Sequence, residues 1–258
     1  MELPERVALV TGGGTGIGKA VARAMAQEGA RVVIAARDWA RLEAVAEELR
    51  AEGHSVLPVA VDVTDKAGNR HCVNRIREHW GRVDILVNNA GASGMTPMDE
   101  ADDGLWHAIV DTNLTGVYLL TKEVLGIMGD DGHGRIINMS SVLGKFGVPG
   151  YAAYCASKHG LIGFTRALAL ELVSRGITVN ALCPGWVDTE MSRTGIEQIA
   201  ERLGTDPESF KQQALAAVPI RRFLDPVEIA RFAVYLASDK ASGITGQALN
   251  ICGGQTMV

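Results

Sequence analysis

Short runs of apolar, mostly β-branched residues recur along the chain and alternate with stretches whose apolar residues have helical spacing. The runs predict strands at Val7–Val10, Arg31–Ala35, Val56–Val61, Ile85–Val87, Arg135–Met139, Ile177–Leu182 and Ala248–Ile251. Most of them are apolar throughout, which is typical of strands that helices cover on both faces. Strands that alternate with helices form parallel sheets. The predicted fold class is therefore α/β, a doubly wound parallel sheet of about seven strands between two layers of helices.

The segments between these strands predict helices. Lys19–Gln27 is rich in alanine, and Trp39–Glu52 places apolar residues among charges at helical spacing. Pro226–Ala237 begins with a proline directly after Asp225, which is a favourable helix start.

A more polar stretch, residues 188–219, falls between two predicted strands and indicates an inserted helical lid. No low-complexity linker or internal repeat interrupts the series of strands and helices. Residues 1–258 are therefore predicted to form a single domain.

The composition excludes some classes of partner. The chain has 258 residues, of which 47% are hydrophobic, and a formal net charge of -5. Such a charge gives no general attraction to nucleic acid or to an anionic membrane. The first residues lack the basic and apolar blocks of a secretory signal, and no apolar run approaches the roughly 20 residues of a membrane span. We expect a cytoplasmic protein without nucleic-acid or membrane partners.

Cysteine and histidine spacing predicts no metal site. The four cysteines are scattered without close pairs, and the six histidines, among them His107, His133 and His159, form no ligand pattern. We expect four reduced thiols. Cys155 has no identifiable base beside it, so it is interpreted as a packing residue rather than a nucleophile.

A glycine-rich turn follows the first predicted strand. Thr11–Gly18 leads from the strand into a helix, with the spacing Gly12-x-x-x-Gly16-x-Gly18. Glycines permit a tight turn and the close approach of a pyrophosphate, while the helix start supplies free N–H groups and positive dipole. Alone, the turn could also be a flexible strand-to-helix connection.

A tyrosine and a lysine four residues apart, Tyr154 and Lys158, lie on one face if the segment is helical. Tyrosine has an unperturbed pKa of about 10, so it transfers protons poorly at neutral pH unless a positive charge favours the phenolate. Lys158 could supply that charge. Taken singly, the pair could equally be exposed on a helix surface.

Three further motifs follow predicted strands: Asp62-Val63, Asn88-Asn89-Ala90-Gly91, and Pro184-Gly185 with Val187 and Thr189. Together with the glycine turn and the Tyr-Lys pair, they resemble the short-chain dehydrogenase/reductase family, in the family order and over essentially the whole chain. The resemblance implies a Rossmann-type fold and a nicotinamide dinucleotide cofactor. It assigns cofactor contacts to Gly12, Thr15, Gly16, Ile17, Gly18, Asp62, Val63, Asn89, Ala90, Gly91, Tyr154, Lys158, Pro184, Gly185, Val187 and Thr189.

The end of the second strand indicates which dinucleotide is used. An acidic residue there binds the ribose of NAD, whereas a cation accommodates the 2′-phosphate of NADP. Alignment with the family pattern puts Ala36 at the acidic position and Arg37 directly after it, so NADP(H) is favoured. NAD(H) stays possible, because a shifted turn could bring Asp38 to the ribose and because Thr15 is not basic. We otherwise expect Asp38 to cap the next helix.

The resemblance also implies how the reacting residues work. Tyr154 would exchange a proton with the carbonyl or alcohol oxygen, and Lys158 would lower the pKa of that tyrosine and hold the nicotinamide ribose. Ser141 matches the residue that binds the substrate oxygen, with Ser140 as the alternative. Asn113 matches the residue that kinks a helix and holds a proton-relaying water.

The expected reaction is reduction of a ketone with hydride from NADP(H). An NAD-dependent alcohol or 3-hydroxyacyl dehydrogenase is the alternative, and a non-catalytic dinucleotide-binding sensor is a third hypothesis. Pocket walls are predicted at Ser93–Met95, Val142–Tyr151 and the lid after Asp188. These walls are largely apolar, which favours acyl or cyclic ketones over small sugars.

Within the family, the chain resembles bacterial 3-oxoacyl-carrier-protein reductases and aromatic polyketide ketoreductases, through Lys158-His159-Gly160 and the ending at residues 248–254. It departs from some ketoreductases because Ala92-Ser93-Gly94 replaces their Pro-Gly-Gly run. The substrate is expected to be a small carbonyl or alcohol, free or bound to CoA or a carrier protein. We expect a homotetramer that pairs through the helices after Asn113 and Tyr151 and through the last strand.

Overall fold

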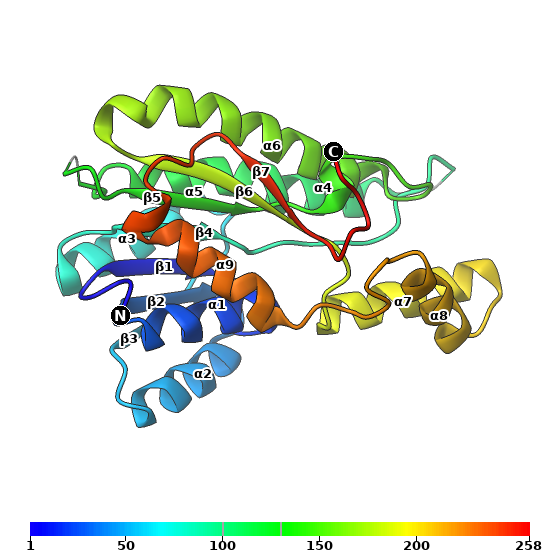
Figure 1. Ribbon diagram of the computed structural model, residues 1–258, viewed down its shortest axis with the longest axis horizontal. Helices are drawn as coiled ribbons and strands as arrows, with labels where there is room; N and C mark the ends of the chain where they lie inside the picture. Colours follow the sequence, from blue (N-terminus) through cyan, green and yellow to red (C-terminus); the bar gives the residue numbers. More distant parts are fainter. Residues whose placement is uncertain (100, 130) are drawn as a thin grey trace.

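The computed structural model describes residues 1–99, 101–129 and 131–258, and these residues form one parallel sheet of seven strands (Figure 1). The strand order is β3-β2-β1-β4-β5-β6-β7. The strands are β1 (Val7–Thr11), β2 (Arg31–Ala36), β3 (Val56–Ala60), β4 (Ile85–Asn88), β5 (Arg135–Met139), β6 (Thr178–Pro184) and β7 (Ala248–Ile251). The predicted α/β fold and its strands are confirmed. The order reverses between β1 and β4, and such switch points place a crevice at the carboxyl ends of the strands.

Alternate residues of each strand bury against helices on opposite faces of the sheet. From β1, Ala8 and Val10 belong to the apolar core that α1, α2 and α9 cover, whereas Val7 and Leu9 belong to the core under α3, α5 and α6. Both cores have almost no exposure to solvent, which explains why the strand sequences are apolar throughout. The bounds are α1 (Gly16–Gln27), α2 (Trp39–Ala51), α3 (Lys66–Trp80), α4 (Gly104–Val110), α5 (Gly116–Val124), α6 (Ala152–Leu172) and α9 (Pro226–Ala237).

Two helices begin at the residues that the sequence predicts as their starts. Asp38 accepts a hydrogen bond from the backbone N–H of Arg41 and so caps α2, as predicted. Asp225 forms a capping box with Glu228 in front of Pro226, which confirms the predicted start of α9. Within the described part of the chain, no helix is both long and apolar enough to cross a membrane.

The polar stretch at residues 188–219 contains two helices, α7 (Glu190–Leu203) and α8 (Pro207–Ala216). They extend beyond the carboxyl ends of the strands, at the right of Figure 1. Thr189 caps α7 by accepting a hydrogen bond from Ser192, and Asp206 caps α8 in the same way from Ser209. The backbone of Asp188 donates to the carbonyl of Leu224, so the segment leaves and rejoins the sheet at neighbouring points.

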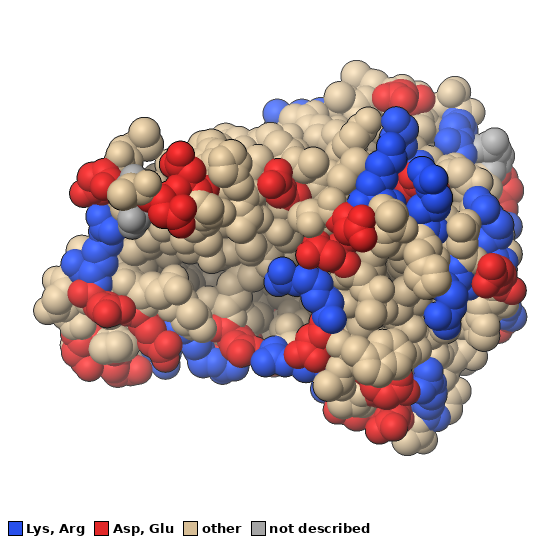
Figure 2. All heavy atoms as spheres, turned by 180° about the vertical axis from the view of Figure 1, so that it is seen from behind, with Lys and Arg blue, Asp and Glu red and all other residues tan. Residues whose placement is uncertain are grey.

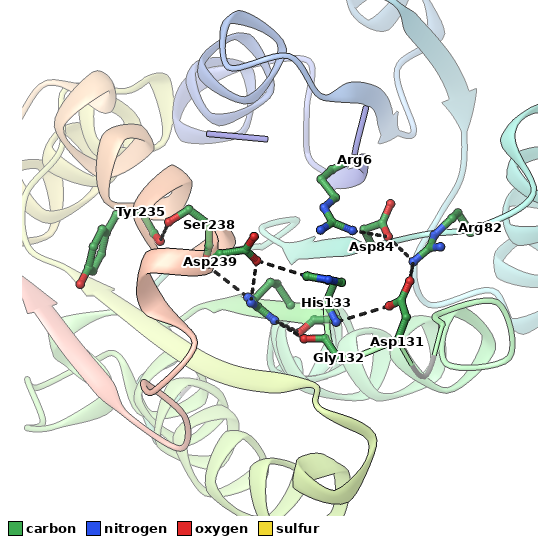
Figure 3. A network of polar contacts seen from close by, with 11 residues as sticks. Arg6, Arg82, Asp84, Asp131, Gly132, His133, Tyr235, Ser238 and Asp239 are labelled. Carbon is green, nitrogen blue, oxygen red and sulfur yellow. Dashed lines mark hydrogen bonds and ion pairs between the residues drawn. The ribbon is translucent and has the colours of Figure 1, made fainter. Parts of the chain in front are cut away.

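At the amino ends of the strands, a network of charged side chains joins three strands (Figure 3). Asp84, just before β4, is only 3% exposed and accepts a hydrogen bond from the backbone N–H of Val7 at 2.8 Å. Its carboxylate also meets Arg82 at 2.5 Å and Arg6 at 3.7 Å. Arg82 reaches Asp131 at 2.6 Å.

Arg135, at the start of β5, extends this network toward α9. Its guanidinium is buried and donates to the backbone carbonyl of Gly134 at 2.9 Å. Longer contacts reach the carbonyl of Ser238 at 3.5 Å and the carboxylate of Asp239 at 3.4 Å. The His133 ring meets the same carboxylate at 3.2 Å. Opposite charges at this end of the sheet are therefore held against one another.

Candidate active site

Tyr154 and Lys158 lie near the start of α6, and the helix places them on one face as their spacing predicts. The Nζ of Lys158 lies 5.5 Å from the centre of the Tyr154 ring. Lys158 is 4% exposed and donates a hydrogen bond to the backbone carbonyl of Met139, at the end of β5, at 2.8 Å. The ring of Tyr151 packs edge-on against Tyr154. The pair is therefore held between α6 and the carboxyl end of the sheet.

Burial sets the protonation of both groups. It raises the pKa of Tyr154 to about 12, with a hydrogen bond from Ser141 acting in the opposite direction. Burial also lowers the pKa of Lys158 to about 8, which the neighbouring Cys183 partly offsets. The expected lowering of the tyrosine pKa by Lys158 is not the net result, because loss of hydration disfavours the phenolate more than its neighbours favour it. At neutral pH the phenol is protonated, and Lys158 is mostly cationic.

Ser141 is the second residue after β5 and faces the crevice. Its hydroxyl accepts a hydrogen bond from the backbone N–H of Leu143 at 3.1 Å, which opens a single 3-10 turn at Val142–Gly144. Ser140 instead points into the protein and donates to the carbonyl of Lys158 at 3.1 Å. The structure therefore brings Ser141 to Tyr154 and gives Ser140 a role in holding α6.

Asn113 lies in a π-helical turn, Asp111–Thr115, between α4 and α5. Its amide accepts a hydrogen bond from the N–H of Ala92 and donates to the carbonyl of the same residue, at 2.8 and 2.9 Å. It also donates to Ser157 at 3.1 Å. A methyl group on Gly91 would lie 3.3 Å from the Asn113 oxygen and 3.8 Å from Lys158 Nζ. Asn113 therefore reaches the lysine side of the site from behind, as a fully buried residue.

The glycine turn after β1 is packed so closely that side chains do not fit. Gly12 has φ +66°, and a Cβ there would lie 2.7 Å from the Asn89 amide. A Cβ on Gly18 would lie 2.1 Å from the carbonyl oxygen of Gly12. Asn89 in turn donates to the Thr11 carbonyl at 2.9 Å, which ties the end of β4 to the turn.

The hydroxyl of Thr15, at the N-cap of α1, makes no capping hydrogen bond. The turn therefore combines a tight, glycine-lined approach with free helix-start N–H groups and a free hydroxyl. These features fit a dinucleotide pyrophosphate.

A cavity of about 200 Å³ runs from this turn to Tyr154 and Lys158. Most of the residues predicted to contact the cofactor line it: Gly12, Thr15, Gly16, Ile17, Asn89, Ala90, Gly91, Tyr154, Lys158, Pro184, Gly185, Val187 and Thr189, together with Ser141. Six further residues line it that were not among the predicted cofactor contacts: Ala92, Met139, Ser140, Glu190, Met191 and Ser192. The last three follow directly after the predicted Thr189, so only the extent of that motif was underestimated.

Five predicted residues lie outside this lining. Gly18 and Asn113 pack behind it, as described above. Val63 is buried, and Asp62 accepts hydrogen bonds from the backbone and side chain of Thr64. Burial acts against ionisation of Asp62, but these bonds and the charge of Arg37 hold its pKa below the usual range. Asp62 and Arg37 therefore lie near each other at the carboxyl ends of β3 and β2.

Arg37 is exposed, and in the described part of the chain it makes no hydrogen bond or ion pair. Ala36, which holds the position of the ribose-binding acid in the alignment, is the last residue of β2. An exposed guanidinium therefore follows the end of β2, close enough to Asp62 to act on its carboxylate.

A second, larger cavity of about 730 Å³ adjoins the first at Ser141, Tyr154 and Gly185. The predicted walls at Ser93–Met95 and Val142–Tyr151 contribute to it. The predicted lid after Asp188 also contributes, through Met191, Ser192, Gly195, Ile199, Arg202, Leu203, Phe210, Ala214 and Ala217, whereas the sequence did not single out Pro97, Trp186 and Gln255. Figure 2 shows a hollow, mostly uncharged in its floor, between the α7–α8 region at the left and the body of the molecule.

An aromatic pair shapes one wall of this second cavity. The ring of Trp186 stacks on Phe223, with 5.6 Å between the ring centres and 10° between the planes. Stacking of this kind holds both rings in place. The cavity is therefore large, apolar and partly aromatic, with Tyr154 where it meets the first cavity.

The family model described as short chain dehydrogenase matches residues 6–200, which include β1 to β6, Ser141, Tyr154 and Lys158. The chain belongs to the short-chain dehydrogenase family. This confirms the resemblance seen in the sequence, and with it an oxidoreductase that binds a nicotinamide dinucleotide.

Similar members of the short-chain dehydrogenase family are known. A Streptomyces violaceoruber protein named as ketoacyl reductase 1 of a granaticin polyketide synthase is 47% identical over 96% of this chain and 92% of its own. The 3-oxoacyl-[acyl-carrier-protein] reductase of Escherichia coli is 40% identical over 100% of both chains. A crystal structure of a variant of actinorhodin polyketide ketoreductase with NADPH has a TM-score of 0.94, at 44% identity and 97% coverage of both chains.

Proposed function

We propose that this short-chain dehydrogenase reduces a bulky acyl or cyclic ketone to an alcohol at the expense of NADPH. The observation that carries the proposal is the meeting of the two cavities at Ser141, Tyr154 and Gly185. A carbonyl group in the large cavity would there face both the phenol and the nucleotide-side cavity. NADPH, when bound, supplies the hydride.

The protein's own residues then handle the oxygen and its proton. Tyr154, with its pKa raised to about 12, is protonated at neutral pH and can donate to the carbonyl oxygen as the hydride reaches the carbon. Ser141 donates a hydrogen bond to the same oxygen. Lys158, cationic below its pKa of about 8, stabilises the phenolate that remains and would hold the nicotinamide ribose. Asn113 keeps this side of the site in place through Ala92 and Ser157.

Cofactor preference rests on Arg37. Its guanidinium is unpaired in the described residues and lies at the end of β2, where a 2′-phosphate would be placed. The similar actinorhodin ketoreductase, crystallised with NADPH, supports the same preference. NAD(H) lacks the phosphate and would leave Arg37 without a partner.

The substrate class rests on the second cavity. About 730 Å³ is more than a small sugar or short alcohol needs, and the walls carry Phe146, Trp186 and Phe210. Similar proteins are named as a ketoacyl reductase and a polyketide ketoreductase, which supports an acyl or cyclic ketone as the substrate. We further propose that the whole chain acts as one domain and that α7 and α8 are the lid over this cavity, since both helices contribute to its lining.

We also propose a homotetramer. Large apolar side chains stay exposed on α4, α5 and α6, namely Leu105, Trp106, Tyr118 and Leu170. The edge strand β7 is half-buried along its whole length. Light scattering should give four times the chain mass of 27.4 kDa, and a monomer in solution would contradict this assembly.

The test of the proposed function follows NADPH and NADH oxidation by absorbance. The panel contains an acetoacetyl thioester, a bicyclic ketone such as decalone, a diketone and a simple cyclic ketone. We expect turnover with NADPH, fastest with the bulky ketones. Tight NADPH binding without turnover of any ketone would instead support a dinucleotide-binding sensor, and turnover only with NADH would overturn the cofactor assignment.

A further inference from the structure

An ion pair connects the lid to the adenosine side of the nucleotide cavity. The guanidinium of Arg41, in α2, donates to a carboxylate oxygen of Glu190 at 2.9 Å. The two residues are 149 positions apart in the chain, and Glu190 is the first residue of α7. Glu190 also lines the nucleotide cavity. The pair therefore spans from the helix that follows β2 to the first turn of the lid.

Arg41 lies directly against the glycine turn. A methyl group on Gly14 would be 3.5 Å from the Cβ of Arg41. Arg41 is also four residues after Arg37 in the chain, and its guanidinium approaches the cap residue Asp38 at 3.4 Å. In folds of this type the pyrophosphate rests on the glycine turn and the ribose meets the end of β2. Arg41 is thus the second cation beside the position of the ribose.

The pair with Glu190 is easily exchanged. The two side chains are 51% and 66% exposed, and ion pairs this exposed contribute little to stability. By contrast, Arg222 is bound by both oxygens of Glu228, at 2.6 and 2.8 Å. A phosphate dianion carries more charge than a carboxylate and can accept two hydrogen bonds from one guanidinium. It would therefore displace a single, solvent-exposed carboxylate contact.

We propose that Arg41 is a second ligand for the 2′-phosphate of NADP(H), and that Glu190 competes with this phosphate for it. Binding of NADP(H) then releases the first turn of α7 from α2. NAD(H), which has no 2′-phosphate, leaves the Arg41–Glu190 pair intact. The proposal rests on the proposed NADP(H) preference and extends it from Arg37 to the lid, so that the lid distinguishes the two cofactors.

The measurement is the dissociation constant of cofactor fragments by isothermal titration calorimetry on the full chain. The probes are 2′,5′-ADP and 5′-AMP, which differ only in the 2′-phosphate, together with NADP⁺ and NAD⁺. Arg41→Gln should weaken the binding of 2′,5′-ADP and NADP⁺ about tenfold, because it removes one charge-assisted hydrogen bond. Glu190→Gln should strengthen the binding of both ligands about threefold, because it removes the carboxylate that competes for Arg41. Neither substitution should change the dissociation constant of 5′-AMP or NAD⁺ by more than about twofold.

A matched control is available on the same helix. Arg193 pairs with Asp188 at 2.9 Å, and both residues are exposed, but neither lines the nucleotide cavity. Arg193→Gln should leave all four dissociation constants unchanged. The double variant Arg41→Gln/Glu190→Gln should bind 2′,5′-ADP like Arg41→Gln alone, since the competition no longer exists.

The outcomes separate this proposal from the one it rests on. If the wild-type protein does not bind 2′,5′-ADP more tightly than 5′-AMP, the NADP(H) assignment itself fails. If the wild type shows that preference, but Arg41→Gln and Glu190→Gln leave it unchanged, the cofactor assignment stands and the competition by Glu190 is overturned.

Discussion

Charged side chains are buried and paired at one end of the parallel sheet, whereas polar groups at the other end lack partners. At the amino ends of the strands, Asp84 and Arg135 are almost fully buried and each is matched by opposite charge or backbone groups. At the carboxyl ends, the exposed Arg37 makes no hydrogen bond or ion pair with any described residue, and the hydroxyl of Thr15 leaves the start of α1 uncapped. A folded chain keeps its polar groups bonded where only stability is at issue. Groups left without partners are therefore available to a ligand.

The comparison also separates two uses of burial. At the amino end, burial strengthens contacts that are complete within the protein. At the carboxyl end, burial raises the pKa of Tyr154, which keeps the phenol protonated, and lowers the pKa of Lys158 toward neutral pH. Substitutions at one end should therefore change stability, and substitutions at the other should change activity.

The largest effect is expected at the carboxyl end. Tyr154→Phe removes the proton donor and should lower kcat about 10³- to 10⁴-fold, at the upper end of general-acid catalysis. NADPH affinity should change by less than about threefold, since the ring stays in place. Steady-state kinetics and cofactor titration measure both, with the exposed Tyr235→Phe as control. Normal turnover in Tyr154→Phe would contradict the assigned mechanism.

At the amino end, Asp84→Asn should lower the free energy of unfolding by about 2–3 kcal/mol, because Arg82 and Arg6 lose their shared buried anion. Urea denaturation measures the change. Turnover at 25 °C should stay within about twofold of the wild type, because Asp84 lies at the opposite end of the sheet. The exposed partner Asp131→Asn is the control and should change stability by less than about 1 kcal/mol. A large loss of kcat in folded Asp84→Asn would contradict the claim that this end of the sheet affects stability and not activity.

Arg37→Asp exchanges a cation for an anion where the 2′-phosphate is expected. We predict that the ratio of kcat/KM for NADPH to that for NADH falls about 10- to 100-fold, mainly through weaker NADPH binding. Thermal stability should be nearly unchanged, because the side chain makes no contact that the fold needs. An unchanged ratio would show that the end of β2 does not meet the ribose.

The smallest effect concerns pH. Lys158 has a lowered pKa of about 8, so it is cationic below that value and neutral above it. Tyr154, with a pKa of about 12, stays protonated over the same interval. Loss of the lysine charge as pH rises from 7 to 8.5 should reduce the rate of ketone reduction about fourfold. A pH–rate profile that stays flat up to about pH 10 would show that the charge of Lys158 does not limit the reaction.

Much of the candidate site could be predicted because its residues belong to short motifs with a fixed spacing along the chain. The strand-ending motifs at Asn89–Gly91 and Pro184–Gly185 meet in one cavity, as parallel strands require. Gly12 and Gly18 are glycines because any side chain would collide with the chain around them. The second cavity was predicted only in part: its lid was expected, but Pro97, Trp186 and Gln255 come from segments whose sequences carry no distinctive pattern.

By itself, the sequence determined the α/β fold, the order of strands and helices along the chain, and most of the residues that line the first cavity. These features depend on periodicity and on motifs a few residues long, which act between neighbours in the chain. Only the tertiary structure decided that Glu190 meets Arg41 across 149 residues, that Ser141 rather than Ser140 faces Tyr154, and that burial raises the pKa of this tyrosine. Contacts between distant segments and the loss of water around a side chain arise from packing, and no local pattern encodes them.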